Sequence, residues 1–383
     1  MTLRRGYALL AALVAVVAAL SVGIVLLART PASAVRSELA RPSVWVGTWA
    51  AAPGGAEPGT SRGFPGSTVS NIVHTSIGGT AARITVSNLY GTGPLRITRA
   101  TVGTHQVTFA GRTAVTVPAG GQTVSDPVRM KVAADADLVV ALLTPAASGP
   151  VTYHPHTQQI STLVTGAVTA PTPYWRYLTA VDVLTNRAEG TVIAFGDSIT
   201  DGYRSSPDAN HRWPDVLADR LAGRYGVVNE GIAGNRLLTD GTGGRSGLTR
   251  FDGDVLARAG AKTVLVALGI NDVLHGSDAQ SITAGLRDLT ERAHARGLRV
   301  IGATLTPFGG YERSTRAREE VREEVNAAIR SGKIFDGVVD FDKVIRDPYA
   351  PKRMLDRYDS GDHLHPGDAG YRAMGRAVPV VGL

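Results

Sequence analysis

The stretch TVIAFGDSITDG, residues 191–202, marks the change of pattern that decides the fold. Residues 191–195 are apolar or β-branched and predict a short buried strand. Gly196 and Asp197 follow this strand, and Ser198 comes next. From here onward, short apolar runs alternate with longer helix-like stretches, which is typical of βαβ units and a parallel sheet. Because ligands bind at the carboxyl edge of such a sheet, the pattern places Ser198 where chemistry would occur.

The same alternation predicts an α/β domain over residues 190–383. Strands are expected at 191–195, 226–229, 263–268, 299–304 and 338–341, and helices at 212–224, 248–259, 279–296, 315–331 and 367–378. In the helix at 315–331, Glu and Arg alternate three or four residues apart, so that opposite charges support a solvated face.

In the region before residue 186, the spacing of the apolar residues is different. Short apolar alternations are broken by turn residues roughly every 8 to 12 positions, which is typical of an antiparallel sandwich. Strands are expected at 43–50, 68–76, 83–90, 95–102, 113–117, 127–132, 137–143, 151–154 and 162–168. A length of 383 residues favours two folded units. We therefore predict a β-sandwich-like accessory domain over residues 42–185, with the boundary near Asn186.

Composition excludes several classes of function. Without the three arginines of residues 1–34, 37 basic residues face 33 acidic ones, and no basic run is interleaved with aromatic residues. Nucleic-acid binding therefore has no support. The chain has no cysteine, which excludes disulfides, thiolate zinc sites and a cysteine nucleophile.

Residues 1–34 have the pattern of a targeting segment. Arg4 and Arg5 precede an apolar run at residues 7–28, and Ala-Ser-Ala at 32–34 resembles a cleavage site. The apolar run approaches the roughly 20 residues that span a bilayer, so an uncleaved membrane anchor is the alternative to a signal peptide. Either prediction makes the protein secreted or anchored to the outer face of the cytoplasmic membrane.

Two further loops are expected at the same edge of the parallel sheet as Ser198. They are NEGIAGN, residues 229–235, and GIND, residues 269–272. Ester hydrolysis passes through a tetrahedral oxyanion, which a glycine N–H and an asparagine amide can stabilise. Glycine and asparagine are also common in ordinary strand-ending turns, but three such loops in register favour a functional site.

The C-terminal segment DHLHP, residues 362–366, precedes the last predicted helix. A serine nucleophile needs a base, and the base needs a carboxylate that orients it. Asp362 stands three residues before His365, whereas Ser360 stands three residues before His363, so His365 is the better base. A metal site formed by Asp362, His363 and His365 is the alternative, although no further His–Glu ligand spacing lies nearby.

Together, four blocks resemble the SGNH/GDSL hydrolase superfamily. They are Gly196-Asp197-Ser198, Gly234 in its asparagine-containing loop, Gly269-x-Asn271-Asp272 and Asp362-x-x-His365. They occur in the family's order and span about half the chain, from residue 191 to the C-terminus. The resemblance implies a flavodoxin-like three-layer fold that uses neither a metal nor an organic cofactor.

Carried over residue by residue, the resemblance implies a catalytic triad. Ser198 would be the nucleophile, His365 the general base and acid, and Asp362 the residue that orients it. The oxyanion hole would be formed by the N–H of Ser198, the N–H of Gly234 and the side chain of Asn271. The implied reaction is hydrolysis of a carboxylic ester through an acyl-enzyme.

The region before residue 186 resembles, more loosely, the N-terminal β domains of exported bacterial members, through GTWAA at 47–51 and NLYG at 88–91. Within it, His154 and His156 could line a polyol-binding surface or wall the active site. The alternative is an edge strand with solvated polar residues.

The leading functional hypothesis is an acetyl or short-acyl esterase that acts outside the cytoplasm on a small ester or an acylated glycan. A long-chain lipase or phospholipase is the alternative within the same class. The alternative from another class is a catalytically silent cell-surface glycan-binding protein, whose β domain contacts polysaccharide or the cell envelope.

Overall fold

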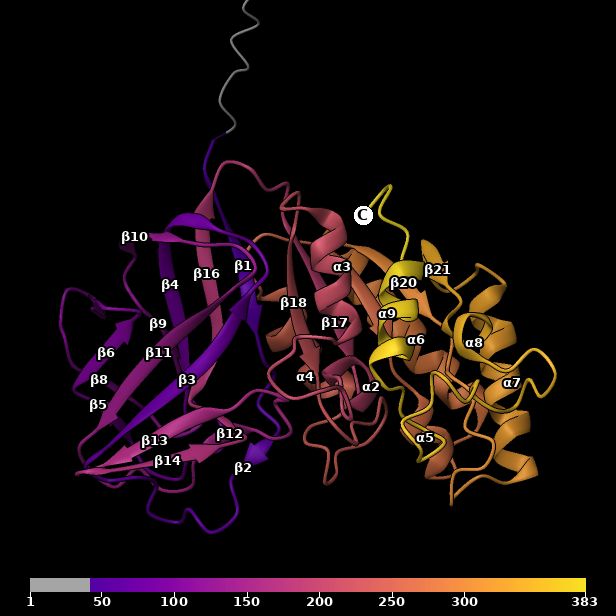
Figure 1. The fold of residues 1–383 in the computed structure, drawn as a ribbon, viewed down its shortest axis with the longest axis horizontal. Coiled ribbons are helices and arrows are strands. Elements are labelled where there is room, and N and C mark those ends of the chain that lie inside the picture. Colours follow the sequence, from indigo (N-terminus) through magenta and orange to yellow (C-terminus); the bar gives the residue numbers. More distant parts are fainter. Residues whose placement is uncertain (1–41) are drawn as a thin grey trace, which may run out of the picture. The chain divides into compact units, whose positions relative to one another are not determined.

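The computed structural model describes residues 42–383. It contains an antiparallel β region, residues 42–185, followed by an α/β region, residues 190–383 (Figure 1). The predicted signal peptide or anchor at residues 1–34 lies outside the described residues. Across residues 42–383, no helix has the length and apolar character needed to span a bilayer.

The β region is built mainly from two antiparallel sheets. The first has the order β1-β16-β4-β10, with β9 also paired to β4; its strands are β1 (Val44–Ala50), β4 (Gly79–Ser87), β9 (Gln122–Val124), β10 (Val128–Val132) and β16 (Leu178–Thr185). The second has the order β14-β13-β3-β11-β6-β7; its strands are β3 (Ser67–Thr75), β6 (Arg99–Val102), β7 (His105–Val107), β11 (Ala136–Thr144), β13 (Ser161–Thr165) and β14 (Val168–Thr172). Smaller sheets pair β12 (Thr152–His154) with β2 (Gly55–Ala56) and β15 (Trp175–Arg176), and β5 (Leu95–Ile97) with β8 (Val115–Val117).

The two larger sheets share one hydrophobic core. Along β3, buried residues alternate with half-buried ones, as expected for a strand with one face inward. Val69 and Val73 of β3 belong to the same buried cluster as Ile84 of β4 and Val183 of β16. The predicted antiparallel sandwich is therefore confirmed.

The α/β region contains a parallel sheet with the strand order β18-β17-β19-β20-β21. The strands are β17 (Thr191–Gly196), β18 (Gly226–Gly231), β19 (Ala261–Ala267), β20 (Arg299–Ala303) and β21 (Gly337–Val339). All pairings are parallel, and the order is that of a flavodoxin-like doubly wound fold. The α/β prediction is confirmed.

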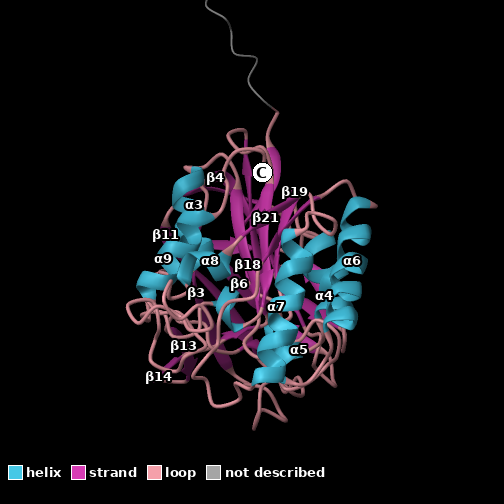
Figure 2. Ribbon diagram, turned by 90° about the vertical axis from the view of Figure 1, so that its right-hand side faces the viewer, coloured by secondary structure: helices cyan, strands magenta, loops and turns pink. Residues whose placement is uncertain are grey.

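Helices cover both faces of this sheet. They are α2 (Ser198–Asp201), α3 (Trp213–Leu221), α4 (Gly247–Phe251), the π-helical turn η1 (Asp252–Leu256), α5 (Ile270–Leu274), α6 (Ala279–His294), α7 (Arg316–Arg330), α8 (Phe341–Ile345) and α9 (Asp368–Ala377). Figure 2 shows α3, α8 and α9 on one side of the strands and α4, α6 and α7 on the other, which gives three layers.

Some predicted elements differ in detail. The strand expected at 95–102 is broken at Thr98 into β5 and β6, which pair with different neighbours. The helix expected at 248–259 is α4 continued by η1, and it ends at Leu256. The strand expected at 338–341 ends at Val339, because Asp340 caps α8 by accepting the N–H of Lys343. The five-residue helices α5 and α8 were not predicted, since they are too short to show a helical period.

The β region packs against the edge strand β18 of the parallel sheet. The N–H of Gly47 donates to Thr191 Oγ1 at 2.9 Å, and the N–H of Val227 donates to Ser76 Oγ at 3.0 Å. Residues 43–383 form one compact unit. Contacts between the two regions can therefore contribute to a site at the carboxyl edge of the sheet.

Candidate active site

Ser198 stands at the first position of α2, directly after β17. Asp197 is the N-cap of α2, and its carboxylate accepts the N–H of Ile199 at 3.0 Å. Capping fixes the tight turn between strand and helix. The turn presents Ser198 at the carboxyl edge of the parallel sheet, as predicted.

The structure brings the three predicted triad residues together. Ser198 Oγ lies 2.9 Å from His365 Nε2, and His365 Nδ1 lies 2.7 Å from Asp362 Oδ2. The other carboxylate oxygen of Asp362 accepts the backbone N–H of His365 at 2.8 Å. Asp362 therefore holds both the ring and the backbone of the histidine.

Hydrogen bonding keeps Asp362 ionised. Burial alone would raise the pKa of this carboxyl, but hydrogen bonds from the His365 side chain and backbone and from the Leu364 N–H hold its pKa well below the usual range. An ionised Asp362 can only accept, so His365 carries its proton on Nδ1 and donates that N–H to Asp362. Nε2 is then the acceptor that faces the Ser198 hydroxyl. This is the protonation pattern that a general base requires.

His363 does not join this group. Its Nδ1 lies 2.7 Å from Asp359 Oδ2 instead. Among residues 42–383, no group of three His, Cys, Asp or Glu side chains has the geometry to hold a metal ion. The alternative metal set of Asp362, His363 and His365 is therefore not brought together.

The predicted oxyanion donors line one cavity with the triad. Ser198, Gly234, Asn271 and His365 all border it. Within the described residues, no hydrogen bond uses the N–H of Ser198 or of Gly234. The Asn271 amide donates one N–H to the Asn235 carbonyl at 3.0 Å, and its second N–H is left over. Three donors thus border the space beside the nucleophile.

A buried arginine that the sequence analysis missed holds these loops in place. Arg250 of α4 donates to the carbonyls of Gly196 and Glu230, both at 2.8 Å, and to Asn235 Oδ1 at 3.0 Å. It thereby joins the ends of β17 and β18 to the residue after Gly234. No local sequence signal marks this role, because a single arginine on a short helix resembles any surface arginine.

The loop around Gly234 depends on a close approach of two backbone segments. Gly234 has a left-handed φ of 75°, which favours glycine. A Cβ on Gly243 would lie 2.3 Å from the carbonyl carbon of Gly234. The tip of the loop, residues 241–244, therefore packs directly on the predicted oxyanion donor.

The cavity at the triad has a volume of about 370 Å³ and is lined largely by polar and aromatic residues. They are His156, Ser198, Tyr203, Ala233, Gly234, Thr242, Gly243, Asn271, Tyr311, Leu364 and His365. His156 comes from the β region, so the hypothesis that it walls the active site agrees with its position. His154 is buried and contacts Asp201. It is therefore not one of the solvated polar residues that the edge-strand alternative would require.

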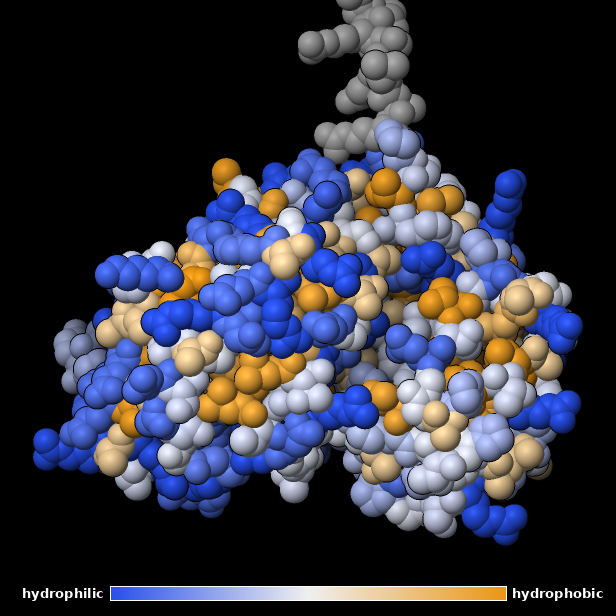
Figure 3. Space-filling model, turned by 180° about the vertical axis from the view of Figure 1, so that it is seen from behind, coloured by the Kyte–Doolittle hydropathy of each residue, from blue (hydrophilic) through white to orange (hydrophobic). Residues whose placement is uncertain are grey.

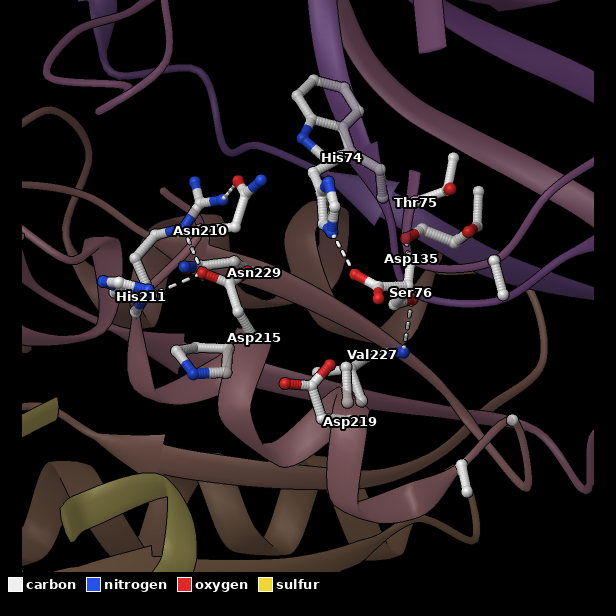
Figure 4. Close-up of a pocket in the computed structure, with 18 of the residues that line it drawn as sticks. His74, Thr75, Ser76, Asp135, Asn210, His211, Asp215, Asp219, Val227 and Asn229 are labelled. Atoms are coloured by element: carbon white, nitrogen blue, oxygen red, sulfur yellow. Dashed lines mark hydrogen bonds and ion pairs between the residues drawn. The ribbon is translucent and has the colours of Figure 1, made fainter. Parts of the chain in front are cut away.

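A second cavity, of about 570 Å³, lies between the β region and α3 (Figure 4). Its charged groups are largely engaged with one another: His74 contacts Asp135 at 2.9 Å, and Arg212 contacts Asp215 at 2.7 Å. None of its lining residues borders the cavity at Ser198. Although this cavity is larger, the nucleophile and its base lie elsewhere.

Asp197 gives the folded state a specific dependence on pH. Burial raises the pKa of this carboxyl from 3.8 to about 7, and the nearby Asp272 adds to the rise. A raised folded-state pKa means that the stability contributed by the protonated form is lost as pH rises through about 7. Asn cannot titrate and can still cap α2, so Asp197→Asn is expected to be more stable than the wild type above pH 7.

The expected gain is a few kcal/mol, because each pKa unit corresponds to about 1.4 kcal/mol. Urea unfolding of both proteins between pH 4.5 and 8.5 measures it. A stability difference that does not change with pH would contradict the raised pKa of Asp197.

Comparisons with known proteins place this region in a family. The model of the GDSL-like lipase/acylhydrolase family matches residues 194–373, a range that contains Ser198, Asn271 and His365. A search of curated proteins found no match.

Solved structures similar to the chain include three bacterial proteins. A G-D-S-L family lipolytic protein from Desulfitobacterium hafniense is 26% identical over 49% of this chain and 97% of its own, with a TM-score of 0.40. A carbohydrate acetylesterase family member from Sinorhizobium meliloti is 21% identical over 49% and 94%, with a TM-score of 0.42. A GDSL-like lipase from Bacteroides thetaiotaomicron is 21% identical over 49% and 85%, with a TM-score of 0.39.

The family match covers the same blocks that the sequence analysis singled out. Residues 194–373 of this chain therefore form a domain of the GDSL-like lipase/acylhydrolase family, which makes the protein a hydrolase of the ester-cleaving type.

Proposed function

We propose that this protein is a serine-dependent carboxylic-ester hydrolase that removes acetyl or other short acyl groups through an acyl-enzyme. The observation that carries the proposal is the unbroken chain of contacts from Ser198 Oγ through His365 to Asp362, at 2.9 and 2.7 Å. A serine, an imidazole and a carboxylate in this order form the arrangement that activates a hydroxyl for attack.

In the proposed mechanism, Ser198 Oγ attacks the ester carbonyl carbon while His365 Nε2 takes its proton. The carbonyl oxygen becomes an oxyanion, which the N–H groups of Ser198 and Gly234 and the Asn271 amide stabilise. Collapse of this intermediate breaks the bond to the alcohol, which leaves with the proton from His365. Water, deprotonated by the same histidine, then attacks the acyl carbon. The bond to Ser198 Oγ breaks, His365 returns the proton to Oγ, and the acid is released.

The cavity supports a short acyl group rather than a long chain. Its volume is about 370 Å³, and only Ala233 and Leu364 among its lining residues are aliphatic. On the face of the molecule in Figure 3, hydrophobic side chains gather in small separate groups rather than in one continuous patch. A long acyl chain needs a larger apolar lining than Ala233 and Leu364 provide, so the long-chain alternative is less well supported.

The silent binding protein is also less well supported, because all the predicted catalytic groups are present and two direct contacts join them. We further propose that the enzyme acts outside the cytoplasm on a small ester or an acylated glycan. That part of the proposal rests on the signal-peptide pattern of residues 1–34 and on the polar lining of the cavity.

A series of p-nitrophenyl esters tests the acyl range. We expect hydrolysis of the acetate and butyrate, with kcat/KM lower by at least about tenfold for the palmitate, because a long chain exceeds the cavity. Equal or faster hydrolysis of the palmitate would instead favour the lipase.

A fluorophosphonate probe tests the nucleophile independently of the substrate. It is expected to label the folded protein at Ser198, as located by peptide mass spectrometry. Folded protein that is neither labelled nor active on any ester would contradict the proposed function and favour the silent binding protein.

A further inference from the structure

The β region contributes one wall of the catalytic cavity. His156, which follows β12, borders the same cavity as Ser198 and His365. Its ring meets the Tyr203 ring edge-to-face with the centroids 5.3 Å apart, and the Tyr203 ring meets the His365 ring in the same way at 4.8 Å. A single aromatic ring therefore separates His156 from the general base.

The chain just before His156 is tied to the α/β region by a buried contact. His154 Nδ1 donates to the Ala52 carbonyl at 2.7 Å, and His154 Nε2 lies 3.1 Å from Asp201 Oδ1. The other oxygen of Asp201 accepts the N–H of Ala233 at 3.1 Å. Asp201 thus links the β region to the loop that carries Gly234.

The chain just after His156 is tied down as well. The N–H of Asp208 donates to the Gln158 carbonyl at 2.9 Å, and Asp208 Oδ1 accepts the N–H of Ile160 at 2.7 Å. With both flanks held, His156 is in place before a substrate arrives. A binding group that is already ordered loses less entropy when it binds.

The His156 ring itself is free to bind. Its side chain is exposed, and within residues 42–383 no hydrogen bond or ion pair to its ring nitrogens is found. Its φ of 56° lies in the left-handed region, which is uncommon for a residue other than glycine. A neutral imidazole offers one donor and one acceptor, which is the pair that a hydroxyl group can satisfy.

The position of His156 assigns it to one side of the ester. The leaving alcohol must receive a proton from His365 Nε2, so it lies on the His365 side of Ser198. His156 and Tyr203 border that side. The acyl carbonyl oxygen instead faces the oxyanion donors, which include Gly234 and Asn271.

We propose that His156 forms a subsite for the alcohol part of the ester, and that this alcohol carries several hydroxyl groups, as in a sugar or another polyol. Tyr203 and Tyr311 border the same cavity, and a phenol ring offers an apolar face with a polar edge. The inference rests on the proposed ester-hydrolase function; it narrows the substrate to esters of a hydroxylated alcohol and names the residue that recognises this alcohol.

Two acetate esters that differ in their alcohol test the subsite: glucose 6-acetate, which carries hydroxyl groups, and ethyl acetate, which carries none. Acetate release by the full chain is measured for the wild type, His156→Ala and His156→Gln. We expect the wild type to prefer glucose 6-acetate. His156→Ala should lower kcat/KM for that ester about tenfold, mainly through KM, because a hydrogen bond is lost. Ethyl acetate hydrolysis should change by less than about twofold.

His156→Gln keeps a donor and an acceptor at the position and is expected to recover most of the loss. His105→Ala is the matched control, because it removes another exposed histidine of the β region, from β7, that does not border the cavity. Its kinetics should equal those of the wild type, and the thermal midpoints of all variants should agree.

Three results would overturn the subsite. One is an equal loss on both esters in His156→Ala, which would place the residue in the common machinery. The second is unchanged kinetics of that variant, and the third is a wild type without preference for the hydroxylated ester. A wild type that is inactive on both esters and on p-nitrophenyl acetate would instead overturn the proposed hydrolase itself.

Discussion

Ser198→Ala and His365→Ala are each expected to lower kcat on p-nitrophenyl acetate by on the order of 10⁵-fold. The first removes the atom that forms the acyl-enzyme, and the second removes the base that lies 2.9 Å from it. Groups that act as one unit lose nearly all of their effect when either is removed. Steady-state kinetics of the purified variants, with the uncatalysed rate subtracted, measure the loss.

The double variant distinguishes a catalytic unit from two separate contributions. If Ser198 and His365 act together, the double variant should be no slower than either single variant, because the effects of cooperating groups are not additive. Circular dichroism should show that all three proteins are folded. Activity within tenfold of the wild type in either single variant would rule out the proposed mechanism.

Arg250→Met is expected to lower the stability of the folded protein by several kcal/mol. The guanidinium is buried, contacts the carboxylate of Asp254 at 3.1 Å and donates to the carbonyls of Gly196 and Glu230. Asp254 keeps a longer contact with Arg258 at 3.7 Å, but it loses its closer partner and the two buried carbonyls lose their donor. Removing one partner of a buried ion pair costs about 3–5 kcal/mol. For a protein of this size the melting temperature should fall by about 5 °C.

Arg316→Met is the matched control for Arg250→Met. The Arg316 side chain is 91% exposed and pairs with Glu320 on the surface of α7, and such pairs contribute about 0–1 kcal/mol. Denaturant unfolding of both variants gives the comparison. If the two variants are equally stable, Arg250 does not hold the strand ends together.

Activity should fall along with stability in Arg250→Met. Asn235 accepts from Arg250, and its carbonyl accepts from the Asn271 amide. Asn235 follows Gly234 in the chain and contacts Asn271, so losing Arg250 removes a contact that positions both predicted oxyanion donors. We expect kcat to fall about 10- to 100-fold at a temperature where the variant is still folded, since removing one such donor costs about 10²–10³-fold.

The sequence by itself determined the α/β domain and the residues of its candidate site. Ser198 could be placed because the end of an apolar strand fixes which edge of a parallel sheet a residue occupies. Asp362 and His365 could be paired because they are three residues apart, so their contact needs only local structure. The oxyanion donors followed from the resemblance, which depends on short blocks in a fixed order.

Only the tertiary structure decided what supports and borders that site. Arg250 reaches strand ends 54 and 20 residues away in the chain, and His154 reaches Asp201 47 residues away. Neither contact leaves a periodic or local trace in the sequence, because the first depends on how α4 packs on the parallel sheet and the second on how the β region packs against the α/β region. The packing of the β region against the α/β region also brings His156 to the wall of the cavity beside His365. The proposed recognition of the alcohol therefore depends on the folded chain and not on any single stretch of it.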